Sequence, residues 1–358
     1  MASYIHHVEI PAYRTIKDLE IDLRPEPGSG RPFRHLILTG PNGSGKSSAL
    51  EWIVKQAGSA TPDHIQWSEP PTPSTMVVYI PTNRQPSFAA VKGPAKLQLK
   101  QPGSELIRGQ ASQFLQYLVN RKTEQAFANI DKDLARERQV QAWFEQFEEQ
   151  LRWLFEDPKL TLSFDSKRFD FTIRRGDGLT HGLQQLADGH AAFLSIFAEM
   201  TLAIEAARDQ PEPPGGVVIV DEIENHLHLR LQEQALPFLT ELFPTFQFIT
   251  ATHSPAVIAS VPDAVVYDMT LRTATPSEAF VGLRYGTLMT GHFHLPSEFD
   301  VDSTEKLEEL RRLVERPAGS EVRIQELEDL LSRRSSTLGY EVWRIVHEPR
   351  PGAEGDGE

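Results

Sequence analysis

The 358-residue sequence contains no cysteine, which excludes disulfide bonds, thiolate zinc sites and cysteine nucleophiles. It also lacks any apolar run approaching the roughly 20 residues that a membrane-spanning helix needs, so we expect no contact with a membrane. The first residues have no apolar signal-peptide core. Without a targeting segment, the expected location is cytoplasmic.

Positive charge is scarce relative to negative charge: 36 Lys and Arg stand against 50 Asp and Glu, a formal net charge of −14 at pH 7. This balance argues against a protein whose whole surface grips nucleic acid, because phosphates are bound by basic residues. Contact with nucleic acid through a local basic groove or through a partner stays open. The length suits one large domain or two modest ones.

The sequence is organised around one glycine-rich stretch. Its residues are Gly40, Pro41, Asn42, Gly43, Ser44, Gly45, Lys46 and Ser47, followed by Ser48. They fit the phosphate-binding P-loop pattern, and the apolar run before them and the helical pattern after them supply the strand and helix that the motif needs. We expect Lys46 to reach the β- and γ-phosphates of ATP and the Ser47 hydroxyl to bind Mg²⁺. The alternative is a glycine-rich turn that only caps a helix.

A second cluster follows the run Val217-Val218-Ile219-Val220, which predicts a strand buried on both faces. Asp221 and Glu222 come directly after it. Asp221 is placed to hold Mg²⁺, and Glu222 to polarise the attacking water. The alternative is a strand that ends in two solvated acids.

Two more polar positions follow predicted strands. His253 comes after the apolar residues 246–251 and could bond a γ-phosphate oxygen or the attacking water, although a lone histidine is often structural. Gln85 follows the strand predicted over 76–80, where polar side chains are well placed for Mg²⁺ or the attacking water. Most strand ends, however, are ordinary loops.

Two weaker signals remain. Asp188 and Gly189 precede an apolar helix whose N-terminus would expose N–H groups to an anion. Arg14 lies between two short alternating segments that predict antiparallel strands beside the P-loop strand. Tyr13 and Arg14 are either a surface pair on a bend or groups near the nucleotide.

The middle of the chain predicts helices over 111–155 and two strands over 160–164 and 169–173. Trp143, Phe147 and Leu151 share one helix face, which we interpret as helix packing and not as a ligand box.

The tail predicts amphipathic helices over 304–315 and 321–334. Asp300 and Asp302 have the spacing of a nuclease metal pair but are interpreted as acids that cap the helix. His292 and His294, on a possible strand, are not taken as ligands, and residues 349–358 are expected to be disordered.

Together these motifs resemble the ABC-type ATPase heads of structural-maintenance, RecF-like and OLD-like proteins. Their order matches: P-loop, Gln85 as a Q-loop, a signature-like turn at 186–190, Asp221-Glu222 and a switch histidine, His253. The run from Asp221 to His228 looks like the form found in predicted bacterial ATPases that are often encoded beside nucleases in anti-phage systems such as Septu and some retrons.

The resemblance implies an α/β P-loop NTPase fold of ABC-ATPase type, with an antiparallel β subdomain, a mixed central sheet and an inserted helical lobe. The expected parts are an N-terminal part of the head (1–86), the inserted lobe (87–182), a C-terminal part of the head (183–275) and a helical tail (276–350).

It further implies a homodimer, or a higher oligomer, that sandwiches two ATP molecules between the P-loop of one subunit and the signature turn of the other. Glu224, Asn225 and His226 would lie at that interface. Hydrolysis is expected to be slow, because the signature turn lacks its usual serine. The implied role is a switch subunit that controls an effector such as a nuclease. The alternatives are a DNA-repair or chromosome-handling ATPase acting directly on DNA, and a nuclease with its own metal site.

Overall fold

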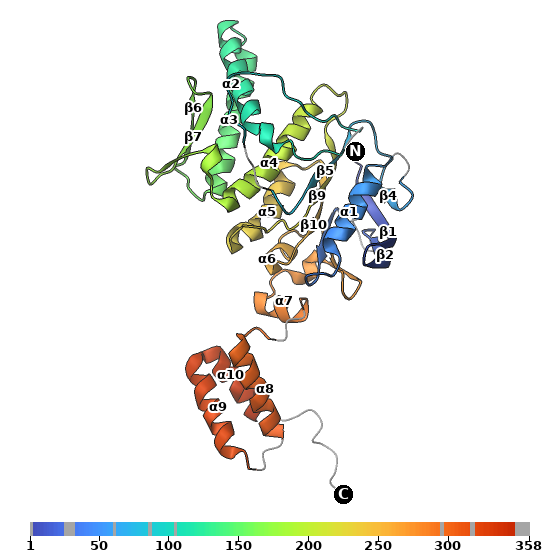
Figure 1. Ribbon diagram of the computed structural model, residues 1–358, viewed down its shortest axis with the longest axis vertical. Coiled ribbons are helices and arrows are strands. Elements are labelled where there is room, and N and C mark those ends of the chain that lie inside the picture. Colours follow the sequence, from blue (N-terminus) through green and yellow to red (C-terminus); the bar gives the residue numbers. More distant parts are fainter. Residues whose placement is uncertain are drawn as a thin grey trace. The chain divides into compact units, whose positions relative to one another are not determined.

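The computed structural model describes residues 3–24, 33–59, 62–84, 88–103, 106–293, 297–315 and 319–347 (Figure 1). The predictions for Gln85, His294 and residues 349–358 therefore lie outside the described residues. The chain divides into two compact units, residues 1–283 and residues 284–358.

The first unit is built on a six-stranded mixed sheet in the order β12-β11-β3-β10-β9-β5. Its strands are β3 (His35–Thr39), β5 (Thr75–Ile80), β9 (Gly215–Val220), β10 (Phe246–Ala251), β11 (Ala264–Asp268) and β12 (Thr273–Pro276). All neighbours pair in parallel except β11 and β12. Because five strands are parallel, their carboxyl ends meet at one edge of the sheet. That edge receives the P-loop, the acids that follow β9 and the histidine that follows β10.

An antiparallel sheet in the order β2-β1-β4 forms the β subdomain. Its strands are β1 (Ile5–Tyr13), β2 (Ile16–Asp22) and β4 (Ile65–Trp67). The first two pair with each other as predicted, but in a sheet of their own and not along β3. A side chain makes the link instead: the buried amide of Gln247 in β10 accepts from the Ile5 N–H and donates to the Ile5 carbonyl, both at 2.7 Å.

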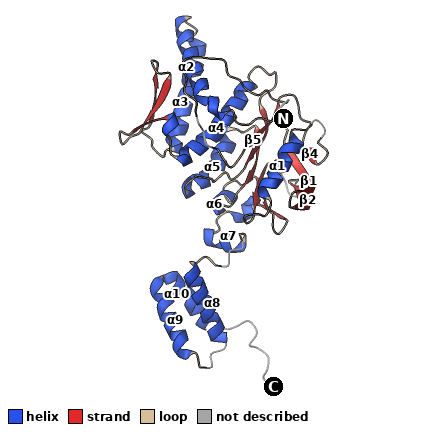
Figure 2. Ribbon diagram, viewed as in Figure 1, coloured by secondary structure: helices blue, strands red, loops and turns tan. Residues whose placement is uncertain are grey.

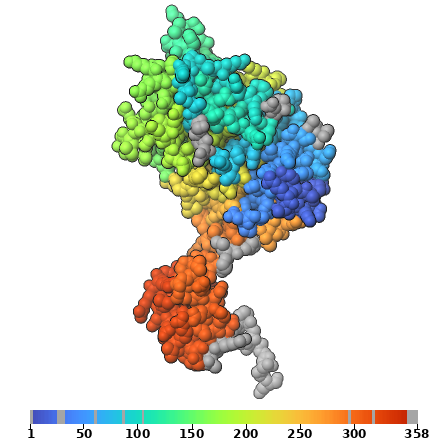
Figure 3. Space-filling view, viewed as in Figure 1, coloured from blue at the N-terminus to red at the C-terminus, as the bar shows by residue number. Residues whose placement is uncertain are grey.

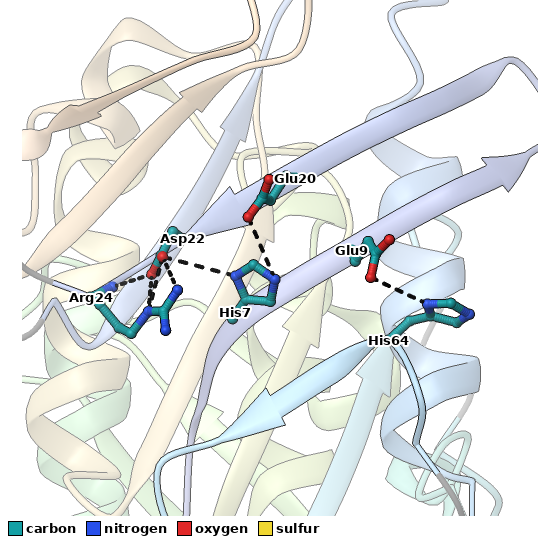
Figure 4. A network of polar contacts seen from close by, with 6 residues as sticks. All are labelled: His7, Glu9, Glu20, Asp22, Arg24 and His64. Carbon is teal, nitrogen blue, oxygen red and sulfur yellow. Dashed lines mark hydrogen bonds and ion pairs between the residues drawn. The ribbon is translucent and has the colours of Figure 1, made fainter.

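Polar side chains cross one face of this small sheet (Figure 4). They are His7, Glu9, Glu20, Asp22, Arg24 and His64. Glu9 lies directly opposite Glu20, a pairing of like charges that is unfavourable by itself. An imidazole nitrogen lies near each carboxylate, 3.6 Å from Glu9 to His64 and 3.8 Å from Glu20 to His7. The opposite face is apolar and turns toward the core.

Helices cover both faces of the central sheet (Figure 2). They are α1 (Lys46–Ala57), with the small sheet, on one side, and α4 (Asp188–Ala206), α5 (Leu229–Leu242) and α6 (Pro255–Ile258) on the other. Leu50 and Ile53 of α1 pack in one core with Leu36 and Leu38 of β3. All six residues of β9 are buried, which confirms the strand predicted from its unbroken Val/Ile run.

The helical lobe forms a continuous teal and green surface of the first unit in Figure 3. Its elements are η1 (Ala111–Gln113), α2 (Phe114–Ile130), α3 (Leu134–Leu154), β6 (Thr161–Asp165), β7 (Asp170–Arg174), β8 (Thr180–Gly182) and η2 (Leu183–Gln185). Phe147 packs edge-on to Phe114 and stacks on Phe197 of α4, with ring centroids 5.5 and 5.4 Å apart. The aromatic face of α3 is therefore helix packing, as predicted.

The elements η3 (Ser277–Phe280), α7 (Tyr285–Gly291), α8 (Val301–Glu315), α9 (Glu321–Arg334) and α10 (Ser336–His347) complete the described chain. In the second unit, α8, α9 and α10 share a small leucine-rich core. No helix in the described part of the chain has both the length and the apolar character required to cross a bilayer.

Of the two tail acids predicted to cap the helix, Asp300 does so at the start of α8 and Asp302 does not. Asp300 Oδ1 accepts from the Ser303 N–H at 3.0 Å and so caps the helix, while Asp302 in its first turn pairs with Lys306 and Arg334. The possible strand around His292 was wrong: this residue ends α7.

Candidate nucleotide-binding site

The loop between β3 and α1 adopts a backbone that only glycine tolerates well. Gly40, Gly43 and Gly45 have φ values of 134°, 84° and 100°. A Cβ atom at Gly40 would lie 2.8 Å from the Ser44 hydroxyl, and one at Gly45 would lie 3.1 Å from Ile16. Backbone conformation thus requires all three glycines, and lack of space adds to this at Gly40 and Gly45.

Two polar groups in this loop suit a phosphate. The Ser44 hydroxyl is buried and has no hydrogen-bond partner among the described residues. The ammonium of Lys46, only 6% exposed as a residue, donates to the carbonyls of Gly40 and Pro41 at 2.8 and 3.1 Å. Burial lowers the pKa of Lys46, and the nearby acids Glu224, Asp221 and Glu222 oppose that shift. A cradle with an unpaired donor and a buried cation fits an anion.

Ser47 and Asp221 meet across the sheet edge, with Ser47 Oγ 3.2 Å from Asp221 Oδ1. A hydroxyl and a carboxylate are ligands that Mg²⁺ prefers, so these residues fit the ion. The described residues contain no group of three His, Asp or Glu side chains that could hold a metal, so the remaining ligands would be water and nucleotide oxygens. When bound, Mg²⁺ would neutralise charge on the nucleotide phosphates.

His253 lies between the P-loop and the acids. The charge state of its ring responds to the Gly40 backbone and to Lys46, Glu222 and Asp221. Burial is the main cause that lowers the pKa of His253, with Lys46 acting in the same direction. The imidazole is therefore neutral at neutral pH, and a neutral ring has one donor and one acceptor nitrogen. Three segments far apart in the sequence thus converge on one site.

The turn after β9 carries Glu224, Asn225 and His226, the three residues expected at a dimer interface. Glu224 Oε1 turns inward and accepts from the His253 N–H at 2.5 Å. Asn225 donates from Nδ2 to the Thr82 carbonyl at 3.2 Å. His226 alone of the three is exposed. Glu224 can reach the turn after β10 because the parallel strands β9 and β10 place their following turns side by side.

Sequence reasoning missed Arg84 as an individual residue. It follows β5, is 8% exposed, and donates to the carbonyls of Asp221 and Glu222 at 2.7 and 2.6 Å. Burial lowers the pKa of Arg84 to about 10, so the side chain stays charged at neutral pH. The available signal was its position, since it belongs to the polar segment at the end of a strand that was singled out for Gln85.

The two weaker predictions, Arg14 and the start of α4, make separate contacts. Arg14 makes an ion pair of 2.7 Å with Glu51 of α1, the helix that follows the P-loop. Asp188 is exposed as the first residue of α4. Gly189 packs against the turn after β9: a Cβ atom there would lie 2.5 Å from the His226 carbonyl oxygen.

The fold and the site are those of a nucleotide-binding P-loop domain. The evidence is the position of the P-loop after β3, the acidic pair after β9, the histidine after β10 and the separate antiparallel subdomain. Residues 108–259 match the family model described as "AAA domain, putative AbiEii toxin, Type IV TA system".

The curated relatives that the chain matches include retron ATPases and a Septu protein. The chain is 36% identical over 70 residues to the Retron Vc95 probable ATPase of Vibrio cholerae serotype O1 biovar El Tor. The matched segment covers 20% of this chain and 14% of that protein. It is 26% identical over 161 residues to the Septu protein PtuA of Bacillus mycoides (strain KBAB4), covering 43% of this chain and 22% of the relative. The matches thus span less than a quarter of these relatives' own length.

Among solved structures, the SMC head domain from Thermotoga maritima gives a TM-score of 0.39 at 13% identity, covering 74% of this chain and 94% of that one. An SmcHead bound to the C-winged helix domain of ScpA gives a TM-score of 0.38, also at 13% identity and with the same two coverages. Over part of its length, the chain is thus similar to retron ATPases and to a Septu protein.

Proposed function

We propose that this chain is an ATP-driven switch subunit: it binds Mg-ATP, dimerises, hydrolyses ATP slowly and controls a partner effector, such as a nuclease, in an anti-phage defence system. The observation that carries the proposal is the convergence of Lys46, Ser47, Asp221 and His253 on one sheet edge. The retron and Septu relatives support the defence setting.

In this proposal each side chain has a defined task. Lys46 and the P-loop amides hold the phosphates, and Ser47 and Asp221 hold the ion. Glu222 accepts a proton from the attacking water, and the neutral His253 orients that water or a γ-phosphate oxygen. Arg14, anchored by Glu51, lies beside the nucleotide.

Dimerisation would complete the site from outside. The three residues Pro41, Asn42 and Gly43 at the tip of the P-loop are exposed, as are Ala187 and Asp188 at the start of α4. A partner's helix start placed over the γ-phosphate would exclude water and supply N–H donors. Ala187 offers no hydroxyl and Asp188 repels phosphate, which is the reason to expect slow turnover.

The test measures the rate at which the purified chain produces ADP from ATP, and the mass of the species present in ATP, which is 40.3 kDa for a monomer. We expect slow ADP production by the wild type and none by Lys46→Ala. We expect Glu222→Gln to accumulate an ATP-dependent dimer. A Glu222→Gln protein that stays monomeric in saturating ATP would count against the switch. Strong stimulation of hydrolysis by duplex DNA alone would favour the DNA-handling alternative.

A further inference from the structure

Arg84 lies in the loop after β5, and its side chain contacts the site although the pairing of β5 does not depend on it. Strand β5 is already paired to β9 through backbone bonds over its full length, and this ladder ends where the Asp221 N–H donates to the Ile80 carbonyl at 2.9 Å. Beyond that point the Arg84 guanidinium takes over. It donates to the next carbonyls in order, those of Asp221, Glu222 and Ile223, at 2.7, 2.6 and 3.4 Å.

The turn that Arg84 holds carries an unusual backbone. Glu222 has a φ of 48°, in the left-handed region that favours glycine, and it is the residue proposed to act on water. Such a conformation persists only where the surroundings fix it. Arg84 binds the carbonyls on both sides of the Glu222 Cα atom, and the amide of Asn225 bonds the same strand-end segment at Thr82.

The charge of Arg84 is also balanced by this turn. A buried guanidinium is costly unless its donors and its charge are satisfied. The carbonyls accept from its two terminal nitrogens, while its buried Nε has no hydrogen-bond partner among the described residues. The negative charges of Glu224, Asp221 and Glu222 act on the guanidinium. The segment that leads into Gln85 is thereby joined to the turn that carries both acids.

We propose that Arg84 is a positioning residue for ATP hydrolysis, which fixes the backbone of Glu222 so that its carboxylate faces the attacking water. This rests on the proposed function. Because Arg84 acts on the turn and not on the nucleotide, its loss should reduce kcat while leaving nucleotide affinity in place. A misplacement of about 1 Å at a reacting group can cost about 100-fold in rate.

The experiment compares Arg84 with Arg121, which is also 8% exposed but lies in α2 and pairs with Glu124. Arg84→Lys, Arg84→Ala, Arg121→Lys and Arg121→Ala are assayed for kcat, for affinity of a fluorescent ATP analogue with Mg²⁺, and for Tm. We expect kcat to fall about 100-fold for both Arg84 variants, with nucleotide Kd within about threefold of wild type. Added guanidinium should restore part of the activity of Arg84→Ala. The Arg121 variants should keep wild-type kcat.

Three results would overturn the inference. One is wild-type kcat in Arg84→Lys and Arg84→Ala. Another is an equal loss of kcat in the matched Arg121 variants. The third is unfolding of both Arg84 variants where the Arg121 variants stay folded, since Arg84 would then be structural. A wild-type protein that neither binds nor hydrolyses ATP would instead defeat the proposed function itself.

Discussion

The carboxylate of Glu224 accepts a 2.5 Å hydrogen bond from the backbone N–H of His253, and this contact joins the turn after β9 to the turn after β10. Burial raises the pKa of Glu224, while its hydrogen bond with His253 opposes the shift. Beyond the last pair of the β9–β10 ladder, Val220 with Thr250, a side chain therefore joins the acid and histidine turns of the site.

Breaking this contact should loosen His253 without touching the nucleotide. Glu224→Ala leaves the His253 N–H without its acceptor, and a buried unpaired donor costs about 1–3 kcal/mol. We expect a lower Tm and a loss of roughly tenfold in kcat at unchanged nucleotide Kd. Glu224→Gln keeps an acceptor oxygen and is the matched control. Equal kcat values for the Ala and Gln variants would contradict this role.

The pairing of Ser47 with Asp221 predicts a metal phenotype for Asp221→Asn. The neutral amide is a weaker ligand for a hard cation than the carboxylate, so the Mg²⁺ concentration for half-maximal activity should rise on the order of tenfold. Asp268→Asn is the control, because Asp268 is a buried acid at the end of the parallel strand β11, whose Oδ1 accepts from the Thr270 N–H. An identical Mg²⁺ requirement in both variants would show that Asp221 does not bind the ion.

The close approach of Gly189 to the His226 carbonyl predicts a dimerisation defect. In Gly189→Ala the new Cβ atom would lie 2.5 Å from that oxygen, so the start of α4 or the turn after β9 must shift. In a Glu222→Gln background, we expect ATP-dependent dimer affinity to weaken about tenfold, the equivalent of about 1.4 kcal/mol. Nucleotide affinity should not change. Gly291→Ala, where a Cβ atom meets nothing within 4 Å, serves as the control.

The buried His35 predicts acid sensitivity of the first unit. Its Nδ1 accepts from the Phe248 N–H at 3.0 Å, and burial lowers the pKa of His35 to about 3 from 6.5. Between these values the unfolded chain binds the extra proton, so stability falls as pH drops below about 6.5. The loss attributable to His35 should reach about 2 kcal/mol by pH 5, at about 1.4 kcal/mol per pH unit.

His35→Asn provides the comparison, because an amide oxygen can accept from the same N–H and does not titrate. Urea midpoints measured from pH 7 to pH 5 should fall more steeply for the wild type than for this variant. Parallel pH dependences would mean that His35 does not carry the effect.

Much of the site was predictable because it is local. The P-loop needs glycines at fixed positions of one short segment, and Gly40, Gly43 and Gly45 adopt the left-handed backbone that the pattern indicates. The unbroken Val/Ile run of β9 likewise predicts burial on both faces, and Asp221 and Glu222 follow it directly in the sequence. The sequence could not place Arg84 or Gln247, because their partners lie 137 and 242 residues away and are backbone atoms, which leave no residue pattern.

By itself, then, the sequence determined the strand–loop–helix of the P-loop, the acidic strand end and the absence of any thiol chemistry, all of which depend on neighbouring residues. Only the tertiary structure decided that β10 lies between β3 and β9, that Glu224 turns toward His253, and that the small antiparallel sheet is joined through Gln247. The physical reason is that strand order and side-chain partners are set by packing over the whole sheet, where any of several buried strands could satisfy the same apolar pattern.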